Sequence, residues 1–236
     1  MISVYRFLIN IVLIFSPIII LIRLIKKKEH LTRFKEKLTI FSKKKVTGDL
    51  VWFHGASVGE LMSVIPLIEK LENNKNIKQI LVTTSTLSSA RIFAKFKFKK
   101  TIHQFFPIDT NYLSKKFLNY WRPNLAIFID SEIWPNMLTN LKNKSISHIL
   151  LNARISKKSF KKWKFLGSFS KNLFKGFDYT YPQNDETQKY LKKLGATKIK
   201  KIGNLKFSES AFNSNKSINL DLRKFLQNKK YWCAAS

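Results

Sequence analysis

Two kinds of residue are scarce in this sequence: cysteine and the acidic residues. The single cysteine, Cys233, can form neither an internal disulfide nor a cysteine-based metal cluster, which is typical of a chain that faces a reducing compartment. Three histidines, His54, His103 and His148, lack the spacing of metal ligands, and the sequence has no P-loop, GxGxxG or zinc motif. It therefore predicts no metal site and no cofactor site of these kinds.

The scarcity of acidic residues leaves a strong positive charge. Aspartate and glutamate number 14 against 44 lysines and arginines, which gives a formal net charge of +30. This excess favours a partner with phosphate groups, such as nucleic acid, anionic lipid or a phosphorylated substrate. A coding bias toward lysine, isoleucine, asparagine and phenylalanine would explain the same charge without a partner. Hydrophobic residues make up 44% of the chain, which suffices for a core and excludes a disordered composition.

Residues 1–25 are mostly apolar and have the length of a membrane-spanning helix. Three consecutive lysines follow, where a cleaved signal peptide would have small residues. We therefore expect an uncleaved membrane anchor, and the positive-inside rule places the rest of the chain in the cytoplasm. Arg6 and Arg23 would then reach toward opposite interfaces. Residues 26–47 are expected to form a basic juxtamembrane segment against anionic headgroups.

Short β-rich runs alternate with helical patterns across residues 48–207. This alternation favours an open, mostly parallel α/β sheet, in which ligands bind beyond the carboxyl ends of the strands. The loops after Phe53, Val82, Ile129 and Leu151 are therefore the first places to search for a site. The expected strands are residues 50–53, 80–82, 125–129, 146–151 and 199–202, and the expected helices are residues 60–71, 88–96, 112–120 and 185–194.

The end of the sequence departs from this pattern. Residues 208–219 are rich in serine, asparagine and lysine, as in a linker. Residues 220–236 then begin a helix and a strand, and a strand at the end of a chain has no domain to join. We therefore expect a further domain of about another 150–200 residues, largely missing from this sequence.

The first candidate site follows the first expected strand, in the stretch HGASVGE that ends at Glu60. Its glycines permit close approach of the backbone to a ligand, and the N-terminus of the next helix offers free N–H groups to an anion. Glu60 could take a proton from an attacking hydroxyl as a general base. Locally a structural role is favoured, because Ser57 and Glu60 have the spacing of a capping box. The helix dipole also stabilises the Glu60 anion, so burial would be needed to make it a strong base.

Three further candidates follow later strands. Asp130 and Glu132 place two carboxylates after an apolar strand, although Asp130 or Ser131 could equally cap the next helix. Arg154 suits bidentate binding of phosphate or carboxylate, although a surface ion pair is the more frequent role of such an arginine. Lys206 could face a phosphate or a developing negative charge, although one lysine among 44 basic residues is normally solvated.

An apolar stripe at roughly helical spacing, interrupted by lysines, follows in residues 160–177. Core packing is the more frequent role of such a stripe, and contact with a membrane surface is the alternative. Its members are Phe160, Trp163, Leu166, Phe169, Leu173 and Phe177.

Taken in order, these stretches resemble the Kdo transferase family of lipopolysaccharide biosynthesis. The resemblance rests on six blocks and extends from the apolar N-terminus to the last residue. The blocks are VWFHGASVGELMSVIPLIEKL, LVTTSTLSSAR, FFPIDT, RPNLAIFIDSEIWPN, ILLNARIS and IGNLKF, and the closing YWCAAS resembles the start of the family's second domain. Gly55, Asp130 and Ser208 are mild departures, because alanine, glutamate and aspartate are expected there.

The resemblance implies a GT-B glycosyltransferase with two facing Rossmann-like domains. This chain would be the N-terminal, acceptor-binding domain behind a membrane-anchoring helix, and the C-terminal domain that binds CMP-Kdo would be largely missing. The implied reaction is attack by a hydroxyl of a phosphorylated lipid A precursor on the anomeric carbon of Kdo, with CMP leaving. The implied partners are this lipid, CMP-Kdo and the anionic cytoplasmic face of the bacterial inner membrane, with no metal, cofactor or nucleic acid.

The resemblance also implies roles for eight residues. Glu60 matches the family's catalytic base, and Glu132 and Lys206 match positions that stabilise the transition state. Five residues match motif positions near the acceptor: Ser57, Gly59, Asn136, Arg154 and Asn204. Without a donor domain, the chain alone is expected to bind the acceptor weakly and to transfer nothing.

Two other kinds of protein stay open at this point. One is a membrane-associated GT-B glycosyltransferase that uses a UDP-sugar as its donor. The other is a non-enzymatic, membrane-tethered protein that binds nucleic acid or anionic lipid. Binding of nucleic acid by such a protein would depend steeply on salt and would be indifferent to Glu60→Gln.

Overall fold

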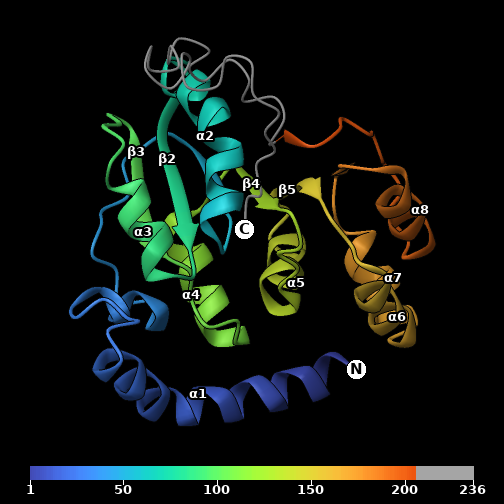
Figure 1. Ribbon diagram of the computed structural model, residues 1–236, viewed down its shortest axis with the longest axis horizontal. Helices are drawn as coiled ribbons and strands as arrows, with labels where there is room; N and C mark the ends of the chain where they lie inside the picture. Colours follow the sequence, from blue (N-terminus) through green and yellow to red (C-terminus); the bar gives the residue numbers. More distant parts are fainter. Residues whose placement is uncertain (206–236) are drawn as a thin grey trace, which may run out of the picture.

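The computed structural model describes residues 1–205, which form a six-stranded parallel sheet covered by helices on both faces (Figure 1). The strand order is β3-β2-β1-β4-β5-β6, and it reverses between β1 and β4. This is the order of a Rossmann-type sheet, whose ligands bind at the reversal point. The strands are β1 (Asp49–His54), β2 (Ile77–Thr84), β3 (Thr101–Phe105), β4 (Leu125–Ile129), β5 (Ser147–Ala153) and β6 (Tyr179–Pro182).

The expected α/β fold class is confirmed, and four of the five expected strands coincide with β1, β2, β4 and β5. The strand expected at residues 199–202 is wrong, because only Ile199 forms a bridge, to Thr180. Its neighbour β6 has four residues and ends at Pro182, which has no N–H to continue the ladder. The expected linker at 208–219 and the further domain beginning at 220 lie outside the described residues, as does Lys206.

The helices that connect the strands confirm the expected helical segments. They are α2 (Val58–Glu72), α3 (Leu87–Phe93), α4 (Asn111–Trp121), α5 (Pro135–Asn143), α6 (Lys157–Phe165), α7 (Ser168–Phe174) and α8 (Asp185–Lys193). Most begin at a side-chain cap; for example, the Ser57 hydroxyl accepts the N–H of Glu60, and Thr110 accepts that of Leu113. The first turn of α5 is an exception, because its cap comes from Asp109 in another loop.

The core has two layers, one on each face of the sheet, and β1 divides its side chains between them. Trp52 packs on one face, with its ring centroid 4.9 Å from that of Phe117 and 5.3 Å from that of Phe128. Phe53 packs on the other face with Ile65 of α2. Both faces are apolar because a parallel sheet is covered on both sides, which is why these strands could be recognised as continuous apolar runs.

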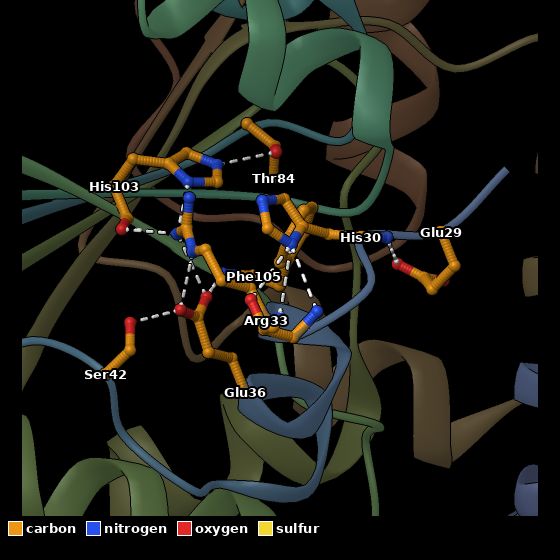
Figure 2. Close-up of polar contacts among 9 residues, drawn as sticks. Glu29, His30, Arg33, Glu36, Ser42, Thr84, His103 and Phe105 are labelled. Atoms are coloured by element: carbon orange, nitrogen blue, oxygen red, sulfur yellow. Dashed lines mark hydrogen bonds and ion pairs between the residues drawn. The ribbon is translucent and has the colours of Figure 1, made fainter. Parts of the chain in front are cut away.

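The basic segment before the sheet is held on the edge strand β3 by an ion pair in η1 (Arg33–Leu38), between the partly exposed Arg33 and the buried Glu36 (Figure 2). Arg33 Nε donates to Glu36 Oε1 at 2.7 Å, and Glu36 Oε2 accepts the backbone N–H of Phe105 at 2.8 Å. Arg33 Nη2 also donates to the carbonyl oxygen of His103 at 2.8 Å. Burial and the charge of Arg33 lower the pKa of His103 to about 3, so its neutral ring can accept a second bond from Arg33. We call Arg33, Glu36, His103 and Phe105 the η1 cluster.

The first helix, α1 (Ile2–Ile25), lies along one edge of the domain, below α4 and α5 in the view of Figure 1. It has 24 residues, and an 18-residue stretch within it has a mean hydropathy of 2.7, so by length and composition it could cross a membrane. The expected apolar N-terminal helix is therefore confirmed. Arg6 does not point away from the domain, because its Nε donates to Asn136 Oδ1 at 3.0 Å.

Candidate active site

Loops from three strands meet at the reversal point of the sheet and line a polar pocket. The loops follow β1, β4 and β5, and the pocket has a volume of about 360 Å³. Three residues predicted from the sequence, Ser57, Glu60 and Arg154, come together in its wall. The complete lining is Ser57, Glu60, Asp130, Ser131, Arg154, Ser156 and Ser159. We call this space the polar pocket.

Glu60 takes part in the capping of α2 and also lines the polar pocket. The Ser57 hydroxyl accepts the N–H of Glu60 at 3.3 Å and donates to Glu60 Oε1 at 3.0 Å, which confirms the cap. The other carboxylate oxygen accepts the N–H of Ala56 at 2.7 Å. Burial and the charge of Glu132 nevertheless raise the pKa of Glu60 above its ordinary value. Burial therefore outweighs the stabilising effect of the helix N-terminus and makes Glu60 a stronger base.

Gly55 leaves room for the Glu60 side chain. A Cβ atom at position 55 would lie 3.1 Å from Glu60 Cβ and 3.2 Å from Ile129 Cδ1, which is tighter than most contacts in proteins. An alanine, as expected from the family resemblance, would require these neighbours to move by a few tenths of an ångström. Gly59 lies in the first turn of α2, next to Glu60, and neither glycine of the motif lines the polar pocket itself.

Glu132 does not line the polar pocket, but its charge acts on Glu60 and its carboxylate is held by two ring nitrogens. His54 Nε2 lies 3.0 Å from Glu132 Oε2, and Trp134 Nε1 donates to the same oxygen at 2.8 Å. The His54 ring is buried and stacks on Phe106 at a centroid distance of 3.8 Å. Burial alone would raise the pKa of Glu132, but the hydrogen bond and charge of His54 outweigh it and lower that pKa.

The environments of Glu60 and Glu132 thus push their pKa values in opposite directions. Such a split is typical of carboxylate pairs that divide acid–base roles at an active site. The sequence placed His54 first in the HGASVGE stretch and excluded it as a metal ligand, but its role as the partner of Glu132 was missed. Its position at the carboxyl end of β1 was the signal that could have identified this role.

Backbone strain marks the ends of β4 and β5. Asp130 and Asn152 have φ values of 60° and 52°, a left-handed conformation that is uncommon outside glycine and clusters at functional sites. The N–H of Arg154 donates to the carbonyl oxygen of Asp130 at 3.1 Å, so the two turns lie side by side. Asn152 Oδ1 accepts the N–H of Leu205 at 3.1 Å. This bond brings the segment with Asn204 next to the end of β5.

Asn136, a predicted acceptor-binding residue, is fully buried and does not line the polar pocket. Its Nδ2 donates to the carbonyl oxygen of Asp109 at 2.6 Å, and its Oδ1 accepts from Arg6. Asp109 in turn accepts the N–H groups of Asn136 and Met137 at 2.9 and 2.8 Å, which caps α5. Burial raises the pKa of Asp109 to about 6. In the structure, Asn136 holds the base of the β4–α5 loop that carries Glu132.

A second, apolar pocket lies beside this loop. It has a volume of about 520 Å³ and lies between α1, the β4–α5 loop and the α6–α7 region. Trp134 belongs to its wall, while the indole nitrogen of the same residue bonds to Glu132. Three members of the apolar stripe line the pocket (Trp163, Leu166 and Phe169), whereas Leu173 and Phe177 are core residues, as favoured from the sequence.

Among residues 1–205, no three His, Cys, Asp or Glu side chains come close enough together to hold a metal ion. The groups that the site brings together are a carboxyl of raised pKa (Glu60), a carboxylate of lowered pKa (Glu132) and the guanidinium of Arg154, which suit acid–base and electrostatic chemistry.

A Rossmann-type parallel sheet with a carboxylate pair at its reversal point defines the class: one Rossmann-like half of a GT-B-type protein. The fold is similar to that of a solved structure. A structure described as "S. aureus MnaA-UDP co-structure" superposes with a TM-score of 0.51 and 12% identity, covering 76% of this chain and 52% of that one. At this identity the similarity concerns the fold alone.

Sequence comparison defines the family. The family model described as 3-deoxy-D-manno-octulosonic-acid transferase (kdotransferase) matches residues 32–209. The 3-deoxy-D-manno-octulosonic acid transferase of Rickettsia bellii (strain RML369-C) is 35% identical over 236 residues. That of Rickettsia felis (strain ATCC VR-1525 / URRWXCal2) is 37% identical over 187 residues, and that of Chlamydia pneumoniae is 29% identical over 211 residues. The chain belongs to the Kdo transferase family.

The chain spans about half the length of these relatives. The match with the Rickettsia bellii protein covers 100% of this chain and 56% of the relative. The matches with the Rickettsia felis and Chlamydia pneumoniae proteins cover 79% and 86% of this chain and 40% and 48% of those proteins.

Proposed function

We propose that this chain forms the acceptor-binding part of an enzyme that transfers Kdo from CMP-Kdo to a hydroxyl of a phosphorylated lipid A precursor. Its membership in the Kdo transferase family supports Kdo glycosyltransfer in lipopolysaccharide synthesis. The observation that carries the proposal is Glu60, a carboxyl group of raised pKa in the wall of a polar pocket at the reversal point of the sheet.

In the proposed reaction, Glu60 accepts the proton of the acceptor hydroxyl as the hydroxyl oxygen attacks the anomeric carbon of Kdo. The bond between this carbon and the phosphate oxygen of CMP breaks, and CMP leaves with the electron pair. The proton remains on Glu60 until solvent removes it. A carboxylate of raised pKa suits this step, because a general base works best when its pKa approaches the working pH.

The other residues of the site have complementary roles in this proposal. Transfer at an anomeric carbon develops positive charge on the sugar ring, and the ionised Glu132, fixed by His54, is suited to stabilise it. Arg154 in the polar pocket is suited to a phosphate of the lipid acceptor. Lys206 follows the segment that Asn152 binds, and we keep it as the candidate that faces the departing phosphate.

The proposed location is the cytoplasmic face of the bacterial inner membrane. The net charge of +30 suits an anionic membrane surface and a phosphorylated lipid, and α1 supplies an apolar helix. The CMP-Kdo site is expected in the part of the relatives that this chain does not span. We therefore expect the 236-residue chain alone to transfer nothing.

The test offers CMP-Kdo and a UDP-sugar in parallel to a complete enzyme that contains this chain and a donor domain. A phosphorylated lipid A precursor serves as acceptor, and the lipid product is identified by mass spectrometry while release of CMP or UDP is measured in parallel. We expect a product with CMP-Kdo only. A product with the UDP-sugar would favour the other glycosyltransferase class, and release of CMP by the 236-residue chain alone would contradict the division of the site between two domains.

A further inference from the structure

Hydrogen bonds and ion pairs tie both ends of α1 to the same domain. At its start, Tyr5 Oη donates to Asp109 Oδ2 at 2.8 Å, and Arg6 donates to Asn136 at 3.0 Å. At its end, Arg23 Nε donates at 3.0 Å to Glu29, a carboxylate that Lys37 of η1 also binds at 2.6 Å. Arg33 and Glu36 of η1 in turn bind the backbone of β3, at His103 and Phe105 (Figure 2).

These contacts have a consequence for a helix that crosses a bilayer. Arg6 and Arg23 are 17 residues apart, so on a straight α-helix they are separated by about 25 Å along the axis. In a spanning helix they would lie near opposite interfaces, and a domain on one side could contact only one of them. In the structure both arginines form hydrogen bonds with the same domain. A spanning arrangement would therefore require the hydrogen bonds of Tyr5 to Asp109 and of Arg6 to Asn136 to break.

The two faces of α1 also differ. Ser16 and Ile20 are buried against the domain, at 4% and 7% exposed, whereas the opposite face consists of large apolar side chains that stand in the open. The most exposed of these are Phe7, Ile14 and Ile25, at 67%, 72% and 73%. A helix that is apolar on all sides is normally covered on all sides. The domain covers one side of α1, and the other side requires an apolar cover.

We propose that α1 lies in the plane of the membrane, with its inner face on the domain and its outer face in the lipid of one leaflet. The partner is a bilayer with anionic headgroups, because Lys26, Lys27 and Lys28 directly follow the apolar helix and the whole chain carries a charge of +30. In-plane helices usually provide their own polar face; here the attached domain replaces that face.

This arrangement sets the level of the site relative to the lipid. Val4 and Leu8 of α1 line the apolar pocket, whose opposite wall includes Trp134, the partner of Glu132. An in-plane α1 therefore keeps the apolar pocket at the surface of the leaflet and the polar pocket close above it. The proposal concerns the position of the helix, so it stands or falls independently of the donor and of the reaction.

The test measures the depth of single residues of the full chain in vesicles of phosphatidylethanolamine and phosphatidylglycerol. Cys233 is replaced by serine, and one cysteine at a time is introduced at Phe7, Ile14 or Ile25 and labelled with a fluorophore. Lipids with quenching groups at known depths then report the position of each label. These three side chains point outward, so the substitutions leave the contacts between α1 and the domain intact.

An in-plane helix gives the same depth at Phe7, Ile14 and Ile25, because all three are on the outer face. A spanning helix instead places Ile14 far deeper than the two end positions. A matched pair sharpens the comparison: Phe15 and Ser16, each replaced by cysteine, are about 1.5 Å apart along the axis, but Phe15 is 53% exposed whereas Ser16 is 4% exposed against the domain. We expect several-fold stronger quenching at position 15 than at 16. Equal quenching of the pair, a deep Ile14, or absence of binding to the vesicles overturns the proposal.

Discussion

Two glutamates, the buried Glu36 of the η1 cluster and the half-buried Glu60 of the polar pocket, show opposite uses of a carboxylate. Both accept backbone N–H groups, from Phe105 at 2.8 Å and from Ala56 at 2.7 Å respectively. Glu36 also has a full cationic partner, because Arg33 donates to both of its oxygens (Figure 2). Within residues 1–205, Glu60 forms no ion pair and instead faces the negative charge of Glu132.

The difference fits a structural role for the η1 cluster and, in the proposed function, a chemical role for the polar pocket. A buried charge with a partner and satisfied hydrogen bonds is tolerated, and loss of the partner is costly. A buried carboxyl beside a like charge binds protons more strongly, which is the property that a general base requires. The η1 cluster therefore fixes the chain on β3, while the polar pocket keeps Glu60 ready to accept a proton.

The largest effect is expected from Glu60→Gln in the complete enzyme. The amide retains much of the cap geometry but cannot accept the proton of the acceptor hydroxyl. Kdo transfer should fall by about 10²- to 10⁴-fold, the usual contribution of a general base. The rate of formation of Kdo-lipid measures this, with Glu69→Gln on the same helix as the matched control. Transfer at the unmodified rate would remove Glu60 from the catalytic role.

Glu36→Ala should give the converse result: the complete enzyme becomes less stable, but the rate of Kdo transfer per folded molecule does not change. It leaves Arg33 without its carboxylate and the N–H of Phe105 without its acceptor. We expect about 3 kcal/mol of destabilisation, near the low end for a broken buried ion pair because Arg33 keeps some access to solvent. Urea unfolding followed by tryptophan fluorescence measures it. The double variant Arg33→Met, Glu36→Leu should regain part of the loss, since it buries no unpaired charge.

The sequence permits prediction of elements that follow local patterns. β1, β2, β4 and β5 were predictable because they are apolar runs followed by helical periodicity, and the Ser57–Glu60 cap because its spacing is local. β3 was missed because its sequence TIHQF buries polar residues, including His103, whose partner Arg33 lies 70 positions away. A buried polar strand has no apolar signature.

Local sequence patterns could not predict the contacts in the site between residues that are far apart in the sequence. Glu132 and His54 are 78 residues apart, and Asp109 caps α5 from 27 residues away. Neither contact follows from periodicity or cap spacing. The family motif placed Asn136 near the acceptor, whereas the structure uses its side chain to bind Asp109 and Arg6. A motif identifies residues that matter, but only their contacts separate those that touch a ligand from those that support the site.

His54→Gln tests the support of Glu132. The variant removes the imidazole that bonds to Glu132 Oε2 while leaving the Trp134 bond in place. A carboxylate that loses its orientation should lower kcat by about 10- to 100-fold, as small misplacements in active sites do. The acceptor KM should change little. A purely structural role for His54 would instead lower the melting temperature and leave kcat of the folded enzyme unchanged.

Glu132→Gln should move the acid limb of the pH–rate profile. Burial raises the pKa of Glu60 most, and the charge of Glu132 adds to that increase. Removing this charge lowers the pKa of Glu60, so the base is deprotonated at lower pH and the acid limb of kcat/KM shifts to lower pH. The profile is measured beside that of Ser131→Ala, which alters the pocket wall without altering charge. A shift to higher pH would contradict the repulsion between the two carboxylates.

The smallest effect is expected at a third carboxylate, the buried Asp109, whose properties are intermediate between those of Glu36 and Glu60. Like Glu60 it has a raised pKa, and like Glu36 it serves structure, because it joins α1 to the cap of α5. Tyr5→Phe removes one donor of Asp109 and leaves its two backbone donors, so we expect about 1 kcal/mol of destabilisation. Since the Tyr5 bond lowers the pKa of Asp109, its loss should raise that pKa further.

The stability deficit of the variant should therefore be smallest at pH 5, where Asp109 is mostly protonated, and larger at pH 8, where it must be buried as an anion. Urea unfolding at both pH values measures the difference, with the exposed Tyr112→Phe as control; a deficit that is equal at the two pH values would mean that Tyr5 acts by packing alone.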